Sequence, residues 1–277
     1  MERGCSAAVR RWPATLGRGR TADGKLSTSA RSVAELGAGP AMTSASCEPV
    51  RASRMVIGLP AYFYPGTPWS RVVAGAPPVR YVIANPSSGP GLSPDPAYTT
   101  VVAASRAAGV EVFGYVSTRW GARPLEEVLQ EIERYRDWYG IASIFFDEAA
   151  TAKIGLPYYR RLSLAVRRTA GARSALNPGC VPDERYAELA DLLVVFEGSY
   201  SAYRTWAPPQ WQDRYPRERF WHLVYAAPRG RVSAALETAE RRSAGVVYVT
   251  DAELDNPWRR LPSYWLEALE TVVALNR

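Results

Sequence analysis

Eight short apolar runs alternate with helical patterns along the chain from Met55 onward. Several of the runs are apolar without interruption, as expected for strands that are buried on both faces of a parallel sheet. The predicted strands are Met55–Leu59, Val79–Ala84, Val110–Val116, Ile141–Phe146, Ser174–Leu176, Leu192–Phe196, Phe220–Tyr225 and Gly245–Thr250.

Helical patterns fill most of the connections between these runs. Pro124–Tyr139 has a proline near its start and places its apolar residues close to one face of a 3.6-residue period. The other predicted helices are Tyr98–Ala108, Leu156–Thr169, Asp183–Leu189, Val232–Ser243 and Ser263–Leu275. The connections after Val72 and after Glu197 are weakly helical at best.

Strand–helix alternation repeated eight times in about 220 residues predicts an α/β fold, a single-domain (β/α)8 TIM barrel. A doubly wound open sheet is the alternative. Against it, the first strand is followed by Tyr62-Phe63-Tyr64-Pro65-Gly66 and not by a glycine-rich phosphate loop.

Two of the predicted strands stop abruptly in carboxylates. Ile144-Phe145-Phe146 runs into Asp147 and Glu148, and Val194-Val195-Phe196 runs into Glu197. An unpaired charge is costly inside a core, so these residues belong where the strand leaves the core. The carboxyl ends of barrel strands are where active sites are built. The pattern indicates acid–base chemistry on a neutral, polar substrate.

Aromatic and amide side chains accompany these acids at the other strand ends. A sugar ring has an apolar face for stacking and hydroxyls for hydrogen bonding, which suits such a rim better than phosphate does. The predicted substrate-binding residues are Tyr62, Tyr64, Asn85, Tyr115, Asn177, Tyr200 and Tyr225.

Each of these residues also has a structural interpretation. Asp147 could cap a helix, and strand alternation would aim Glu148 away from Asp147 unless the backbone bends. Asn85 and Asn177 each precede a proline and could serve as turn formers. His222, the only histidine, is best interpreted as a buried strand residue, which leaves little basis for a histidine-based metal site or triad.

The charge is unevenly distributed along the 277 residues. The net charge is +7, and residues 1–54 hold nine Arg or Lys and four Asp or Glu, which leaves +2 for residues 55–277. The globular part therefore lacks the basic stripe that phosphate backbones require, and no nucleic-acid partner is predicted. We expect a disordered Arg-, Ser- and Ala-rich leader over residues 1–54 and the barrel over residues 55–277.

Several other functions lack a sequence signal. No run of eighteen apolar residues exists, so no membrane span is predicted, and the leader lacks the apolar core of a signal peptide. Cys5, Cys47 and Cys180 fit neither a disulfide framework nor a zinc site. We expect a monomer without metal or cofactor.

Six motifs in order resemble the spherulin-4-like glycoside hydrolases. They are Tyr62-Phe63-Tyr64-Pro65-Gly66, Asn85-Pro86 with Gly89-Pro90-Gly91, Gly114-Tyr115-Val116 with Thr118, Phe145-Phe146-Asp147-Glu148, Asn177-Pro178-Gly179 and Phe196-Glu197. The resemblance spans the whole predicted barrel, from Val56 to the last helix.

The resemblance implies an enzyme that cleaves internal α-1,4 linkages in an N-acetylgalactosamine-containing exopolysaccharide, such as a biofilm matrix. It also implies that Asp147, Glu148 and Glu197 are the important carboxylates. Family members are usually secreted or membrane-anchored, whereas this leader shows no recognisable export signal, so the compartment stays undetermined.

Glycoside hydrolysis needs one carboxyl group to protonate the leaving oxygen and a second group to attack or stabilise the anomeric carbon. Our hypothesis pairs Glu197 with either Asp147 or Glu148. A barrel that binds carbohydrate without cleaving it is an alternative, and it would not need three carboxylates. A polysaccharide deacetylase is another alternative, although it would normally require a metal ion.

Overall fold

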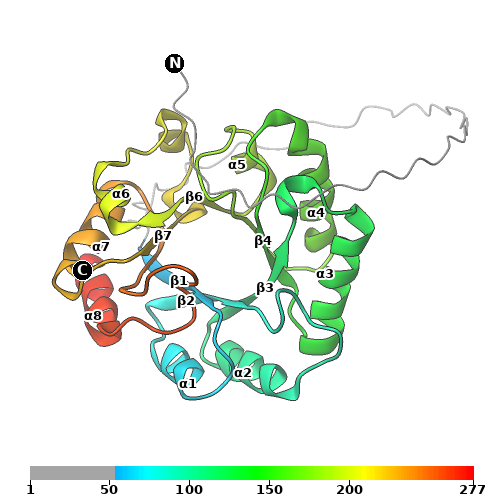
Figure 1. The fold of residues 1–277 in the computed structure, drawn as a ribbon, viewed down its shortest axis with the longest axis horizontal. Helices are drawn as coiled ribbons and strands as arrows, with labels where there is room; N and C mark the ends of the chain where they lie inside the picture. The colour runs from blue at the N-terminus through cyan, green and yellow to red at the C-terminus, as the bar shows by residue number, and fades with distance from the viewer. Residues whose placement is uncertain (1–53) are drawn as a thin grey trace, which may run out of the picture. The chain divides into compact units, whose positions relative to one another are not determined.

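In this computed structural model, residues 54–277 are described, and they form a closed barrel of eight parallel strands in chain order (Figure 1). The strands are β1 (Val56–Ala61), β2 (Val79–Ala84), β3 (Glu111–Ser117), β4 (Ser143–Asp147), β5 (Ser174–Leu176), β6 (Leu192–Ser199), β7 (Phe220–Tyr225) and β8 (Val246–Val249). Strand β1 pairs with β8 through Val56↔Val246 and Ile57↔Val247, which closes the ring. The predicted (β/α)8 barrel is confirmed, and the open-sheet alternative is wrong.

Helices surround the strands (Figure 1). They are α1 (Thr67–Ala74), α2 (Pro96–Ala107), α3 (Leu125–Tyr139), α4 (Leu156–Arg167), α5 (Tyr186–Leu189), α6 (Tyr200–Thr205), α7 (Val232–Arg241) and α8 (Trp265–Leu275). Helix α1 was not predicted, because its eight residues span only about two turns, too few for a helical period to stand out in the sequence. Helix α6 has six residues, in keeping with the weak helical signal after Glu197.

Helix α3 shows how the sequence specifies these elements. Its buried residues Leu125, Val128, Ile132, Tyr135 and Tyr139 recur at intervals of three or four, so they form one face that packs on the barrel. Glutamates in the first turn complement the helix dipole. The helix ends at Gly140, whose φ of +65° is the left-handed conformation that glycine adopts without strain.

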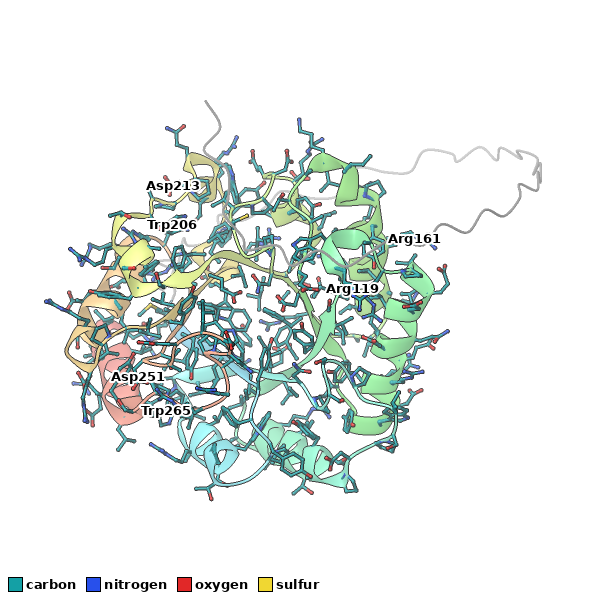
Figure 2. All side chains as sticks on the ribbon, in the orientation of Figure 1. Arg119, Arg161, Trp206, Asp213, Asp251 and Trp265 are labelled. Carbon is teal, nitrogen blue, oxygen red and sulfur yellow. The ribbon has the colours of Figure 1, made fainter. Side chains whose placement is uncertain are left out.

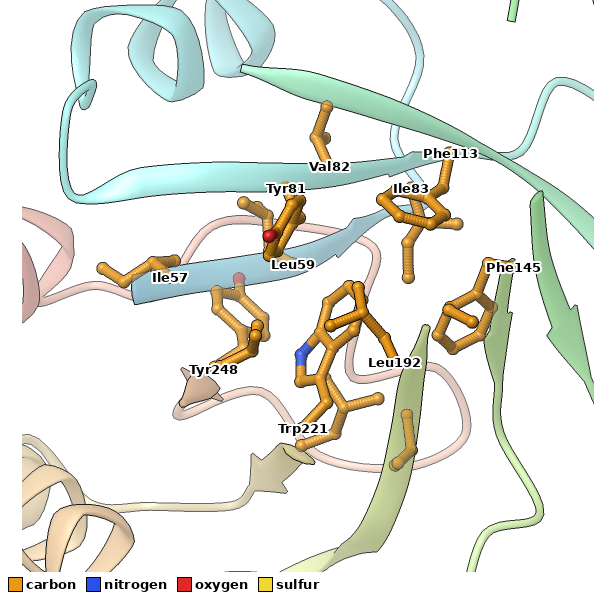
Figure 3. Packing of buried hydrophobic residues seen from close by; sticks show 14 of the residues in the cluster. Ile57, Leu59, Tyr81, Val82, Ile83, Phe113, Phe145, Leu192, Trp221 and Tyr248 are labelled. Carbon is orange, nitrogen blue, oxygen red and sulfur yellow. The ribbon is translucent and has the colours of Figure 1, made fainter. Parts of the chain in front are cut away.

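Large aromatic side chains fill the barrel interior (Figure 3). The ring of Trp221 on β7 contacts the rings of Tyr81, Phe113 and Phe145 from β2, β3 and β4. The Trp221 indole donates a hydrogen bond to the carbonyl oxygen of Gly58 on β1, at 3.1 Å. These rings close the interior, so chemistry has to take place above them.

Strand alternation places the predicted acids above this aromatic layer. Tyr115 lies two residues after Phe113, and Asp147 lies two residues after Phe145, so each projects to the same side of its strand as the buried ring below it. The carboxyl ends of β3 and β4 therefore carry these two residues at the mouth of the barrel.

Strand β6 extends farther than predicted and is irregular. It runs to Ser199, so Glu197 lies within the strand, and its register against β7 shifts between Val194 and Phe196. Such an irregularity re-aims side chains. The Phe196 ring packs against Tyr203 and Trp206, while Glu197, the next residue, points to the opposite side of the strand.

The predicted leader, residues 1–54, lies outside the described residues apart from Arg54, so the division at residues 54 and 55 stays a prediction. None of the helices within residues 54–277 combines the length and the apolar character needed to cross a bilayer.

Candidate active site

A single amide nitrogen brings two of the predicted carboxylates together. The Nδ2 of Asn177 donates one hydrogen bond to Asp147 Oδ1 at 2.8 Å and a second to Glu197 Oε2 at 2.5 Å. Asp147 ends β4, Asn177 follows β5 directly and Glu197 lies near the end of β6. Three adjacent strands thus supply one constellation, in which Asp147 and Glu197 form what we call the carboxylate pair.

Asn177 is held rigidly between these acids. Only 4% of its surface is exposed, and its side-chain oxygen accepts a hydrogen bond from the Gly179 backbone at 3.0 Å. Its own backbone N–H donates to Phe146, and its carbonyl accepts from Ala149. Asn177 was predicted to bind substrate, whereas the structure directs both of its amide hydrogens to the carboxylate pair.

Aromatic donors complete the surroundings of the pair. The Tyr115 hydroxyl is hydrogen-bonded to Asp147, and the Trp258 indole is hydrogen-bonded to Glu197. Tyr62 packs edge-on against Tyr115, with ring centroids 5.4 Å apart. Tyr225, at the end of β7, packs edge-on against Trp258 at 6.3 Å. Of the predicted rim residues, Tyr62, Tyr115 and Tyr225 therefore surround the pair.

Sequence analysis missed Trp258. It lies in the long connection between β8 and α8, 61 residues after Glu197, the last of the predicted acids. The available signal was its local sequence, Asn256-Pro257-Trp258, an aromatic residue after an X-Pro turn on the carboxyl side of the last strand. This resembles the other turns that were singled out.

Burial raises the pKa values of both acids of the pair, and the charge of Glu197 adds to the rise at Asp147. Burial, followed by the negative charge of Glu197, raises the pKa of Asp147 to about 7, while the hydrogen bond from Tyr115 opposes this rise. Burial also raises the pKa of Glu197, opposed by the hydrogen bonds from Asn177 and Trp258. Two close carboxyl groups in a partly dry site favour a state that shares one proton near neutral pH.

Glu148 lies beside this pair and not within it. Its φ of +50° is left-handed, so the backbone turns sharply after Asp147. The Ser117 hydroxyl donates a hydrogen bond to the Glu148 carboxylate, and the Glu148 carbonyl accepts from the Trp120 backbone N–H at 2.6 Å. Glu148 therefore faces the cavity next to β3, which also has Tyr115 and Ser117 in its lining.

The remaining predicted residues make local contacts. Tyr64 is 64% exposed and its hydroxyl donates to Asp95 at 3.3 Å. The Asn85 side-chain oxygen accepts from the Gly89 backbone at 2.9 Å, as a turn former does. Tyr200 is half-buried at the first position of α6. The structure does not bring these three side chains to the carboxylate pair.

His222 is fully buried on the outer side of β7, where its Nδ1 lies 2.7 Å from the Tyr203 hydroxyl. Burial lowers the pKa of His222 to about 3, so it is neutral in ordinary conditions. Over residues 54–277, no group of three or more His, Cys, Asp or Glu side chains is arranged to hold a metal ion.

Comparison with known proteins agrees with the fold and the motifs. The chain matches the spherulation-specific family 4 over residues 56–272. Spherulin-4 of Physarum polycephalum is 34% identical over 249 residues, which cover 85% of this chain and 74% of that protein. The crystal structure of Aspergillus clavatus Sph3 in complex with GalNAc superposes with a TM-score of 0.69 at 26% identity, covering 80% of this chain and 98% of that chain.

The maltogenic α-amylase AmyB from Thermotoga neapolitana has a TM-score of 0.54 at 9% identity, covering 81% of this chain and 77% of that chain, which indicates a shared fold alone. The family match over most of the barrel, together with the Physarum relative, identifies the chain: it belongs to the spherulation-specific family 4.

Proposed function

We propose that this barrel is a glycoside hydrolase that cleaves internal α-1,4 linkages in an N-acetylgalactosamine-containing exopolysaccharide, with Asp147 and Glu197 as its catalytic residues. The observation that carries the proposal is the single Asn177 amide that donates to both carboxylates. Glycoside hydrolysis requires two carboxyl groups at a fixed short spacing, one protonated and one ionised, and a close pair that shares one proton near neutral pH meets this requirement.

The spacing also bears on the stereochemistry. Asp147 Oδ1 and Glu197 Oε2 both accept from the Asn177 nitrogen, at 2.8 and 2.5 Å, so these two oxygens are at most 5.3 Å apart. Retaining enzymes hold their carboxyl groups about 5–5.5 Å apart, whereas inverting enzymes leave about 6.5–9.5 Å for a water molecule. We therefore infer retention of the anomeric configuration.

In the proposed reaction, the protonated member of the pair donates its proton to the glycosidic oxygen as the bond to the anomeric carbon breaks. The ionised member attacks or stabilises that carbon, and water later completes hydrolysis with the first member acting as base. Tyr62, Tyr115, Tyr225 and Trp258 would line the bound sugar. The N-acetylgalactosamine class is supported by the GalNAc held by the 26% identical Aspergillus protein.

The proposal is tested by product release from α-1,4-linked N-acetylgalactosamine oligosaccharides. We expect Glu197→Gln and Asp147→Asn each to lower kcat by about 10²–10⁴-fold, because proton transfer or charge stabilisation is lost. The control is Glu253→Gln, an isosteric change at an exposed residue in the connection after β8, which should leave kcat unchanged. Glu148→Gln should affect kcat less than either change in the pair.

Full activity in Glu197→Gln would exclude the proposed pair. Tight binding of the oligosaccharide without any product from the wild type would indicate a barrel that binds carbohydrate and does not cleave it.

A further inference from the structure

The polar cavity that Glu148 faces lies beside the carboxylate pair, on the β3–β4 side of the barrel. Its volume is about 440 Å³, within the range of about 300–1,000 Å³ that small-molecule sites occupy. The lining includes Ser88 from the loop after β2, Tyr115 and Ser117 from β3, and Glu148 from the end of β4. Tyr115 also hydrogen-bonds Asp147, so one side chain belongs both to the cavity lining and to the surroundings of the carboxylate pair.

The backbone beside this cavity is strained. Arg119, which lines the cavity, has a φ of +46°, and Trp120 has a φ of +55°. Non-glycine residues in this conformation cost about 1–3 kcal/mol each and persist where surrounding contacts hold them. The holding contacts here are the hydrogen bond from the Trp120 N–H to the Glu148 carbonyl and the 2.9 Å bond from the Thr118 hydroxyl to the same carbonyl.

This strained turn presents an exposed aromatic ring. The Trp120 side chain is 58% exposed, although a tryptophan normally gains free energy by being buried. Figure 2 shows the neighbouring Arg119 on the side of the barrel where β3 and β4 lie. Trp120 follows Arg119 in the chain and its N–H bonds to Glu148, and both of these residues line the cavity. An exposed indole beside a polar cavity is suited to stack on the apolar face of a sugar ring.

The charges of the lining indicate which sugars fit. The Arg123 guanidinium is occupied, because it donates to Glu131 at 3.1 and 2.7 Å and to the Ser117 carbonyl at 2.8 Å. Three glutamates and two arginines line the cavity, so the lining carries one net negative charge. A sugar bearing a carboxylate or sulfate would be repelled, whereas hydroxyls can bond to Ser88, Arg119 and Glu127.

We propose that this cavity and Trp120 together form a subsite for a second sugar unit of the polysaccharide, one without a negative charge, next to the unit held at the carboxylate pair. The inference rests on the proposed function and extends it, since it assigns the substrate a length and a charge class.

The test compares substrates of different length. An aryl N-acetylgalactosaminide reaches the carboxylate pair alone, whereas an α-1,4-linked N-acetylgalactosamine hexasaccharide can reach the subsite as well. We expect Trp120→Ala and Arg119→Ala to lower kcat/KM for the hexasaccharide by about threefold to tenfold, the size expected for one aromatic or polar contact, and to leave the aryl glycoside unaffected. Trp120→Phe should restore most of the loss, because a phenyl ring also stacks.

The matched control is Leu164→Ala, which removes an equally exposed apolar side chain (57%) from α4. Binding to the Glu197→Gln protein, measured by calorimetry, gives a readout that does not depend on turnover. In that background Trp120→Ala should weaken hexasaccharide binding, and an oligogalacturonide of the same length should not bind.

The outcomes separate the two proposals. If the wild type cleaves and Trp120→Ala has equal effects on both substrates, the subsite proposal is overturned and the hydrolase proposal stands. The same follows if hexasaccharide binding is unchanged in Trp120→Ala and in Arg119→Ala. Binding that depends on Trp120, without cleavage by the wild type, would overturn the hydrolase and support the subsite. Neither cleavage nor binding of the hexasaccharide would overturn both.

Discussion

Asn177 acts on both carboxylates, so its replacement should alter the pH dependence as well as the rate. Its hydrogen bond lowers the pKa of Glu197 against the effect of burial. We expect Asn177→Ala to lower kcat by about tenfold to a hundredfold. We also expect the apparent pKa values of the carboxylate pair in the pH profile of kcat to move to higher pH, because the ionised forms lose a hydrogen-bond donor. The measurement is kcat as a function of pH. A lower kcat with an unmoved limb would indicate a role that does not involve this hydrogen bond.

Replacement of Asp147 by asparagine, its amide isostere, should stabilise the folded protein at a pH where Asp147 is ionised. Its pKa is raised in the folded state, from 3.8 to about 7, so the folded form binds the proton more tightly. The stability contributed by this proton is fully present below pH 4 and is lost as the pH rises through 7. We expect Asp147→Asn to raise the free energy of unfolding by on the order of 2 kcal/mol at pH 8, where Asp147 would be ionised, and by little at pH 4, where it is protonated. The expected gain at pH 8 is smaller than the full pKa shift would give, because Asp147 retains some exposure to solvent.

Urea unfolding at the two pH values measures this difference. A variant that is destabilised at both would show that the charge repulsion inferred for the pair is absent. The residues that we assign to chemistry are thus expected to cost stability, as strained or desolvated active sites generally do.

At the scale of elements, strand β1 is packed so closely against the barrel interior that one methyl group should not fit. A Cβ at Gly58 would lie 2.6 Å from both Trp221 Cζ2 and Val246 Cγ1. We expect Gly58→Ala to lower the free energy of unfolding by about 1–3 kcal/mol through overpacking. Gly230→Ala is the matched control, since a Cβ there meets nothing within 4 Å, and its effect should stay within about 0.5 kcal/mol.

Chemical unfolding of Gly58→Ala and Gly230→Ala, measured side by side, tests this prediction. Equal stability would mean that Trp221 moves at no cost, contrary to its indole hydrogen bond with Gly58 and its three aromatic contacts.

At the scale of the whole molecule, a pair of hydrogen bonds joins the first and last segments of the barrel. The Met55 N–H donates to Asn276 Oδ1 at 2.9 Å, and Asn276 Nδ2 donates to the Met55 carbonyl at 2.8 Å. These bonds tie the end of α8 to the start of β1. We expect Asn276→Ala to lower the free energy of unfolding by about 1–2 kcal/mol, measured by urea titration.

Glu270→Ala, at an exposed position of the same helix, controls for changes in helix propensity. An unchanged transition in Asn276→Ala would show that closure relies on the β1–β8 pairing alone.

Much of the architecture followed from local patterns. Apolar runs of strand length, separated by helical periodicity, are direct consequences of burial on both faces of a sheet, so eight strands and most helices could be predicted. Helix α1 could not, because eight residues span only about two turns and give a period too few repeats to be recognised. The bounds of β2, β5 and β7 are as predicted, whereas those of the other five strands are displaced by one to three residues, as in β6, where tertiary pairing carries the ladder on to Ser199.

The chain's own sequence determined that it folds into a (β/α)8 barrel and that Asp147, Glu148 and Glu197 lie at its carboxyl rim, because burial patterns and strand ends are local properties. Tertiary structure alone decided which acids meet. The left-handed turn at Glu148, the register shift in β6 and the Asn177 amide select Asp147 and Glu197 as neighbours. Trp258 joins them from a distant loop. Such proximity depends on backbone bends and cross-strand register, which residues far apart in the sequence set together.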